Sequence, residues 1–116
     1  MAKASAQLGS LPRDRNGIAI QVGFSFSTSD ATGTPQVSPL AFSTAVITIV
    51  VPDTAVEMVC MPTTDMRISE LVGMAQYDVI KANIKEVIGC AKQQNIYIKR
   101  DSADGSLNFR FTLLGS

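Results

Sequence analysis

The clearest pattern in the sequence is an alternation of apolar and polar residues between positions 18 and 26, which read IAIQVGFSF. The apolar face of this run carries Ile18, Ile20, Val22, Phe24 and Phe26. A period of two over nine residues is typical of a half-buried β-strand. We therefore expect one strand over 18–26, preceded by a turn at Asn16-Gly17, with this face toward the interior.

A second alternating pattern lies near the C-terminal end. It consists of two runs, NIYIKR at 95–100 and LNFRFTL at 107–113, joined by DSADGS. The predicted inward positions are Ile96, Ile98, Leu107, Phe109, Phe111 and Leu113. Asp, Ser and Gly favour turns, and Gly105 can adopt a positive φ. This pattern predicts a β-hairpin.

The middle of the chain predicts further short strands. Residues 44–51 are mostly β-branched and apolar on both faces, which is typical of a strand covered on both sides, by a second sheet and by a neighbour. Strands are also expected over 56–61, ending at Pro62, and over 65–69. Residues 27–43 read as a long loop, because Pro35 and Pro39 exclude a central strand. Long loops in compact domains are often functional, so a partner contact is expected here.

Residues 76–92 fit two structures. Their apolar spacing suits an amphipathic helix with Asp78 as N-cap. The many β-branched residues and Gly89 favour two short strands around a turn at 81–83. We favour the strands.

Together these elements predict an all-β domain over residues 18–116, an antiparallel sandwich or barrel of about seven strands. Residues 1–17 are small, polar and interrupted by Gly and Pro, so they predict an extended N-terminal arm. Such an arm either packs on its own domain or docks on a neighbouring subunit.

The composition of the chain limits which kinds of partner it can bind. Ten basic and ten acidic residues cancel, so the chain has no broad field to attract nucleic acid or anionic membrane. No apolar run approaches a transmembrane span, and the first ten residues lack the apolar centre of a signal peptide, so synthesis in the cytoplasm is expected. Charged residues make up only 17% of the chain, which fits a surface partly covered by a partner or a β-protein rich in Ser and Thr.

Little in the sequence suggests catalysis. The chain has no His, which removes the commonest general base, the usual catalytic triads and a zinc site. No phosphate-binding glycine loop is present. The carboxylates that could work in pairs are Asp53, Glu57, Asp65, Glu70, Asp78 and Glu86. Because most lie at strand ends or turns, we expect capping or solvated roles, and we predict no catalytic, cofactor-binding or metal-binding residues.

A few other side chains invite a functional interpretation. Asp101 and Asp104 could meet a Ca²⁺ ion, but two carboxylates fall short of its coordination number, and turn formation is the simpler reading. Cys60 and Cys90 are expected as buried thiols, with a disulfide as the alternative. The candidates for an exposed aromatic platform are Tyr77 and Tyr97. The residues Met58, Met61, Met66 and Met74 suit either core packing or an interface.

The second half of the chain resembles a known class. TAVITIVVP precedes a VEMVCM strand, then a D-x-R-[IV]-S-E segment at Asp65, Arg67, Ser69 and Glu70, and finally NIYIKRDS and GSLNFRF. Over about residues 44–113 this is similar to small virion proteins of tailed bacteriophages, the capsid decoration or cement class and related head proteins. The resemblance implies a β-sandwich or β-tulip-like module, often trimeric, that binds the major capsid protein on the outer capsid lattice. It brings no active-site residues.

The expectation is therefore a non-enzymatic homo-oligomer on the virion surface, with neither nucleic acid nor membrane as partner. The interface candidates from the arm and the strand at 44–51 are Lys3, Leu8, Leu11, Arg13, Arg15, Ile47, Ile49 and Val51. The alternative is a head-fibre or tail-associated β-sandwich that binds a glycan or receptor through loop 27–43 or 101–106. A small enzyme is a third reading, and it would need carboxylates that converge in one pocket.

Overall fold

The computed structural model describes residues 22–90 and 94–114. The predicted arm, residues 1–17, and positions 18–21 of the predicted first strand lie outside the described residues. The strands are β1 (Val22–Ser25), β2 (Ser27–Ser29), β3 (Pro35–Val37), β4 (Leu40–Phe42), β5 (Ile47–Val50), β6 (Ala55–Pro62), β7 (Met66–Ser69), β8 (Asp78–Ile80), β9 (Glu86–Gly89), β10 (Asn95–Arg100) and β11 (Gly105–Leu114). In this part of the chain no helix is long and apolar enough to cross a bilayer.

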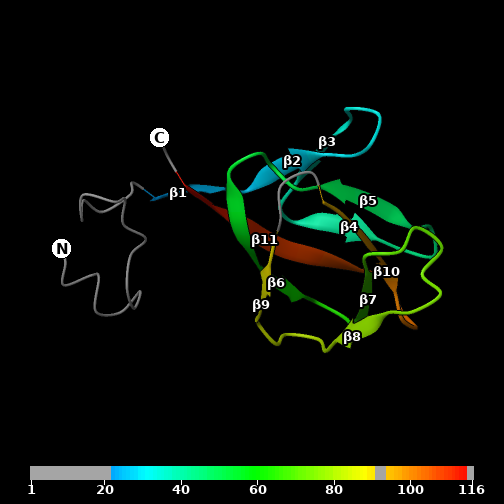
Figure 1. Cartoon of the computed structure of the whole chain (residues 1–116). Coiled ribbons are helices and arrows are strands. Elements are labelled where there is room, and N and C mark those ends of the chain that lie inside the picture. The colour runs from blue at the N-terminus through cyan, green and yellow to red at the C-terminus, as the bar shows by residue number, and fades with distance from the viewer. Residues whose placement is uncertain (1–21, 91–93, 115–116) are drawn as a thin grey trace.

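These strands form two antiparallel sheets and a small ribbon (Figure 1). The sheet that we name the β11 sheet has the order β1-β11-β6-β9, with β4 also paired to β11. The β10 sheet has the order β5-β10-β7-β8, and β2 pairs with β3 as a separate ribbon. The prediction of an all-β sandwich is confirmed, and residues 22–90 and 94–114 contain eleven short strands in place of the predicted seven or so.

Apolar side chains from both sheets form the core. Phe109 and Phe111 of β11 meet edge to face, with ring centroids 5.8 Å apart. The core cluster comprises Phe42, Ile49, Val51, Ala55, Met58, Cys60, Met66, Ile80, Ile96, Ile98, Leu107, Phe109 and Phe111. All six residues predicted to face inward at the C-terminal end are in this cluster or, for Leu113, packed against it. Of the four methionines considered for an interface, Met58, Met66 and Met74 are buried, while Met61 is exposed.

The predicted C-terminal hairpin is wrong. β10 pairs with β5 and β7, whereas β11 pairs with β1, β4 and β6, so the two strands belong to different sheets. Residues 101–104 therefore cross from one sheet to the other. Alternation gives the same sequence pattern to two strands that pair and to two strands that face each other across a core.

The prediction for residues 18–26 is wrong in two respects, namely where the strand ends and which of its faces is buried. β1 ends at Ser25, and Phe24 and Phe26 are 54% and 58% exposed. The reason is the register with β11, in which Phe24 lies opposite Thr112 and Ser25 opposite Phe111. Directly opposed residues share a face. Phe24 therefore points outward with Thr112, because Phe111 faces the core.

Residues 27–43, predicted as a loop, contain β2, β3 and β4. β1 and β4 lie one after the other along the same edge of β11, and the β2–β3 ribbon is inserted between them. The hydroxyl of Ser38 accepts a hydrogen bond from the Phe109 backbone N–H in the gap between β1 and β4. Pro35 opens a strand of the two-stranded ribbon, and β4 pairs with β11 alone, so no central strand occurs here, as expected.

Two further predictions concern β5 and the segment 76–92. β5 is shorter than predicted, and its second neighbour is the β2–β3 ribbon of the same chain, because the Thr28 hydroxyl donates to the Val50 carbonyl. The two strands favoured for 76–92 are confirmed as β8 and β9, and residues 91–92 lie outside the described residues. Their turn closes through a hydrogen bond from the Ile84 N–H to the Lys81 carbonyl, with Asn83 at φ 61°.

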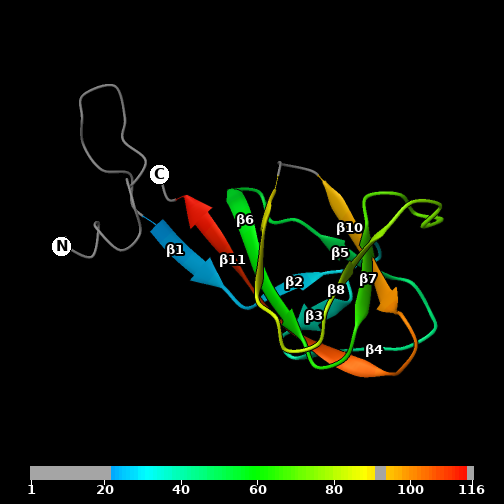
Figure 2. The ribbon, with the colours of Figure 1, turned by 90° about the horizontal axis from the view of Figure 1, so that it is seen from below.

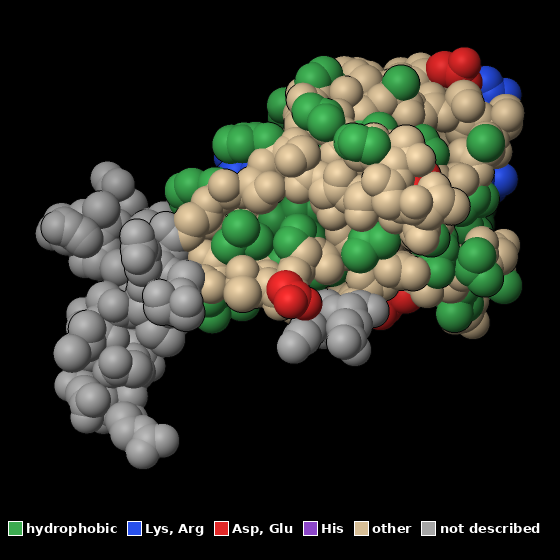
Figure 3. Space-filling model, turned by 90° about the horizontal axis from the view of Figure 1, so that it is seen from above, with side chains coloured by type: hydrophobic (Ala, Val, Ile, Leu, Met, Phe, Trp, Pro, Cys, Tyr) green, Lys and Arg blue, Asp and Glu red, His purple; other side chains and the backbone are tan. Residues whose placement is uncertain are grey.

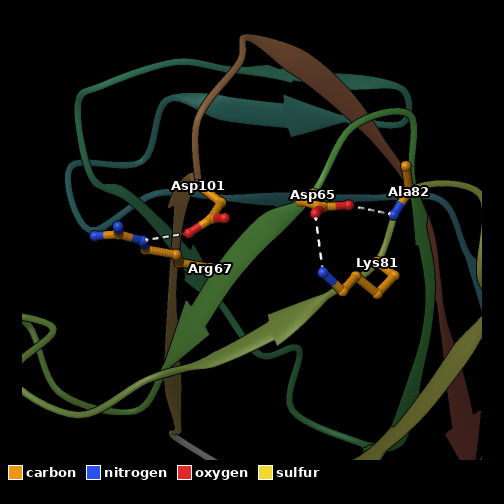
Figure 4. A network of polar contacts seen from close by, with 5 residues as sticks. All are labelled: Asp65, Arg67, Lys81, Ala82 and Asp101. Carbon is orange, nitrogen blue, oxygen red and sulfur yellow. Dashed lines mark hydrogen bonds and ion pairs between the residues drawn. The ribbon is translucent and has the colours of Figure 1, made fainter.

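Asp65 holds this turn against the start of β7 (Figure 4). One carboxylate oxygen accepts from the Ala82 N–H at 2.9 Å, and the other lies 3.3 Å from the Lys81 ammonium. The Ala82 hydrogen bond, and after it Lys81, hold the pKa of Asp65 below its ordinary value of 3.8. A carboxyl whose pKa is lowered by folding stabilises the fold above its unfolded pKa, and this contribution disappears as pH falls through the folded value.

Asp65→Asn tests this contribution. Asn keeps an acceptor for Ala82 but loses the ion pair, so we expect a lower Tm than wild type at pH 7. The difference in Tm should shrink below about pH 4, where the wild-type carboxyl also becomes neutral. Thermal melts between pH 3 and 7 measure it. Lys81→Met leaves the Ala82 hydrogen bond in place, so it should lower the Tm less than Asp65→Asn at pH 7. A Tm difference for Asp65→Asn that does not change with pH would contradict a stabilising role of the ionised Asp65.

Candidate functional site

The interface candidates divide into two groups. Lys3, Leu8, Leu11, Arg13 and Arg15 lie outside the described residues. The strand candidates are described, and they are corrected: Ile49 is 0% and Val51 3% exposed, and Ile47 packs against the same core. The face of β5 that was assigned to a neighbour is therefore the inner face of the sandwich.

One group of exposed apolar residues lies on the outer side of the β11 sheet, which we name the outer face. It carries Phe24, Phe26, Met61 and Val87 as exposed side chains, with Val59 half-buried between them. The pairing of β6 with β9 and β11 places Val59 between Val87 and Arg110. Sequence reasoning missed this surface because it placed Phe24 and Phe26 in the interior.

The outer face is hollowed and bordered by positive charge. A depression of about 490 Å³ lies over Phe26, Pro39, Val59, Met61, Lys85, Asn108 and Arg110, and also reaches Ser38, Cys60 and Phe109. The Arg110 guanidinium lies 4.4 Å from the centroid of the Phe24 ring, a cation–π contact. The ion pairs between described residues use Arg67, Lys81 and Arg100, so Lys85 and Arg110 have no carboxylate partner among them.

In the view of Figure 3, hydrophobic side chains reach the surface at many points, and acidic or basic ones are few. This agrees with the 17% of charged residues in the sequence.

A second hollow lies between the free edges of the two sheets, and we name it the edge groove. It measures about 770 Å³ and separates β8, the last strand of the β10 sheet, from β9, the last strand of the β11 sheet. Ile68, Ile80, Ile88 and Ile96 contribute its apolar lining. Within the described residues β8 pairs only with β7, and β9 only with β6, so each presents one unpaired backbone edge to the groove.

Three of the six candidate carboxylates line the edge groove: Glu70, Asp78 and Glu86. All three belong to exposed residues. Glu70 accepts a hydrogen bond from the Gln94 side-chain amide at 2.9 Å. Acid–base catalysis by paired carboxyls needs one of them in an apolar, desolvated setting. The exposed carboxylates of this groove instead supply negative charge at its rim.

The other three carboxylates are placed separately. Asp65 holds the β8–β9 turn, Glu57 accepts from the Thr112 hydroxyl at 2.9 Å, and Asp53 is exposed. No group of three or more His, Cys, Asp or Glu residues in the described part of the chain is arranged to hold a metal ion.

Asp101 and Asp104 form ion pairs at the connection between the two sheets. Asp101 lies 3.0 Å from Arg67, and Asp104 lies 2.8 Å from Arg100 (Figure 4 shows the first pair). Arg67 also lies 4.5 Å from the centroid of the Tyr77 ring, so one face of this candidate aromatic platform is covered. Tyr97 is half-buried.

Both cysteines are free, Cys60 buried and Cys90 half-buried. Burial raises the pKa of Cys60 to about 12, and that of Cys90 to about 11, so both thiols stay protonated near neutral pH. The disulfide alternative fails on geometry. Cys60 lies opposite Glu86, four residues along β9 from Cys90, or roughly 13 Å, which is beyond disulfide reach.

Comparison with known proteins adds no relative: no protein family, no curated protein and no solved structure matches this chain. The class defined by the fold is therefore that of all-β sandwich proteins.

Proposed function

We propose that this chain is a non-enzymatic structural protein of a tailed-phage virion, which binds the outer capsid lattice as a homo-oligomer and stabilises the head. The observation that carries the proposal is the outer face, where two phenylalanines, a methionine and a valine are exposed on one side of a sheet. Contiguous exposed apolar surface on a folded domain marks an interaction site. The resemblance of residues 44–113 to capsid decoration proteins supports the choice of partner.

The energetics favour a partner that offers many equal sites. Fully burying a Val, Met or Phe side chain contributes about 1.5–3 kcal/mol, and the four exposed residues of the outer face are already partly covered. Association itself costs at least about 4 kcal/mol. One such contact is therefore weak, whereas an oligomer that engages several lattice sites at once gains avidity.

Binding to capsids tests the proposal. Capsids assembled without this chain, from the major capsid protein that is encoded with it, would be incubated with the purified protein and sedimented. We expect saturable binding at symmetry-related positions, and at least a tenfold weaker affinity for Val87→Asp, because a charge would be buried in the contact. Val46→Asp is the matched control, since Val46 is exposed but precedes β5, in the other sheet.

Circular dichroism must show that both variants are folded. Failure of the folded wild-type protein to bind, or equal binding by Val87→Asp, would overturn the assignment of the outer face. Cryo-electron microscopy of the virion gives an independent answer, because density at a single vertex or in the tail would contradict a lattice-wide role.

A further inference from the structure

We propose that the edge groove is an acceptor site for a β-strand donated by a second copy of this chain. The donated strand is residues 18–21, with Ile18 and Ile20 entering the groove, while Arg13 and Arg15, which precede the predicted Asn16-Gly17 turn, reach its acidic rim. This deepens the proposed function, on which it rests for the homo-oligomer, by naming the contact between copies.

The walls of the groove suit an inserted strand. β8 and β9 each present an unpaired edge, and addition of an extended segment to such an edge supplies main-chain hydrogen bonds. β9 spans four residues, or roughly 13 Å, which is enough for four or five residues of a partner strand. The isoleucines that line the groove would pack against alternate apolar side chains of that strand. Residues 18–21 read IAIQ and supply this alternation.

The charges of the two partners are complementary. The described lining contains three carboxylates, Glu70, Asp78 and Glu86, and neither Lys nor Arg. The arm, residues 1–17, contains Lys3, Arg13 and Arg15 against Asp14, a net charge of 3 − 1 = +2. The pairing of β9 with β6 places Glu86 opposite the buried Cys60, and opposed residues share a face, so Glu86 points toward the groove.

The same molecule cannot place Ile20 in its own groove. β1 begins at Val22, which pairs with Leu114, and β1 and β9 are the opposite edges of the β11 sheet. Three strand spacings separate them, about 14 Å. Ile20 lies two residues from Val22 and reaches at most about 7 Å. Figures 1 and 2 agree in placing β1 at one end of the molecule and β8 toward the other, which puts the far wall of the groove further still from Val22.

Glu86 distinguishes this proposal from a simpler explanation. An inward-pointing charge on an edge strand can protect that edge from unwanted pairing. If Glu86 only protects the edge, reversing a charge of the arm leaves the association between copies unchanged. Replacing Glu86 by an apolar residue would then strengthen that association. If it receives the arm, the reversed charge weakens association and a reversed arm restores it.

Charge exchange in the full-length protein tests the inference, with light scattering after size exclusion at micromolar concentration as the readout. We expect the wild type to exceed the mass of one chain, as a closed ring of head-to-tail contacts. Glu86→Lys and Arg15→Glu should each raise the dissociation constant about tenfold, and the double variant should recover most of the association. Asp53→Lys, a charge change at an exposed residue outside the groove, is the control.

Mixing the two single variants gives the sharpest result. Arg15→Glu keeps an intact groove, Glu86→Lys keeps an intact arm, and the two reversed charges are again opposite in sign, so an equimolar mixture should associate nearly as strongly as the wild type, while each variant alone associates about tenfold more weakly. A monomeric wild type, unchanged association in both single variants, or stronger association of Glu86→Lys would overturn the inference. Capsid binding that survives such a result would leave the binding to the capsid lattice standing, whereas loss of capsid binding with intact self-association would remove only the proposed function.

Discussion

Phe111→Ala should lower the free energy of unfolding by about 3–5 kcal/mol, the usual cost of removing a buried phenylalanine. Phe111 is 0% exposed, lies in the central part of β11 and packs edge to face on Phe109. Its removal leaves a cavity between two sheets that are held apart by many other side chains, so the site cannot easily collapse. Chemical denaturation monitored by circular dichroism measures the loss, and a domain of this size typically has only 5–15 kcal/mol in total.

Phe26→Ala is the matched control, because the same side chain is removed from the outer face, where it is 58% exposed. We expect a loss below about 1 kcal/mol, since a mostly exposed ring contributes little buried area. Similar losses for the two variants would show that the outward orientation of the residues near β1 is wrong. It would also remove the outer face as a binding surface.

The sequence predicted the central strand of the core well, because its alternation was unambiguous. Leu107, Phe109 and Phe111 face inward as their period of two requires, and the adjacent Asn108, Arg110 and Thr112 are exposed or half-buried. Period alone settles which residues share a face. It settles which face is inside only when one of the two is clearly polar.

The strand near residue 24 shows where this inference fails. Its apolar face carries large residues, and yet it points outward, because its orientation is imposed by the register with β11. The ribbon at 27–37 then turns the chain away before a long strand can form. Neither the register nor the insertion has a local signal, since both depend on residues more than seventy positions away.

The order of strands in the sheets was inaccessible for the same reason. A short polar segment with Asp and Gly favours a hairpin, but residues 101–104 connect the two sheets. Ion pairs from Arg67 and Arg100 to Asp101 and Asp104 stabilise that connection, and one of these arginines comes from another strand, β7. Local turn propensity therefore predicts that the chain turns at this point, but it does not predict which strand each of the two flanking strands pairs with.

The outer face and the edge groove could not be predicted from the sequence either. The carboxylates of the edge groove come from the loop after β7, from β8 and from β9, and they meet only because two sheets end side by side. Sequence reasoning identified each of them as a candidate, but assigned solvated roles without a common location. The signal that could have linked them is the pair of short strands in 76–92, which the spacing of β-branched residues did indicate.

Gly105→Ala should destabilise the fold by about 1–3 kcal/mol, the usual cost of forcing an extra group into filled space. Sequence reasoning valued Gly105 for a positive φ, but among the described glycines only Gly33, at 89°, adopts one. Gly105 is required by space instead. A Cβ there would overlap the Thr64 Oγ1, and it would lie 2.9 Å from the Thr63 Oγ1 and 3.1 Å from the Phe42 ring.

Those two hydroxyls have little freedom to move, because each makes a hydrogen bond at the corner between the sheets. Thr63 Oγ1 accepts from the Ser106 N–H at 2.9 Å, and Thr64 Oγ1 donates to the Ala103 carbonyl at 3.0 Å. A methyl group at Gly105 must displace at least one of them, so a hydrogen bond is lost together with the packing.

A double-mutant cycle separates this crowding from any other effect of the substitution. Thr64→Ala removes the closest atom, so Gly105→Ala combined with Thr64→Ala should cost less than the sum of the two single changes. Gly73→Ala serves as the control, because a Cβ there meets nothing within 4 Å, and we expect a change within about 0.5 kcal/mol. Equal losses for Gly73→Ala and Gly105→Ala, or strict additivity in the cycle, would contradict a steric role for Gly105, and the close approach of residues 63–64 to the start of β11 would then need another cause.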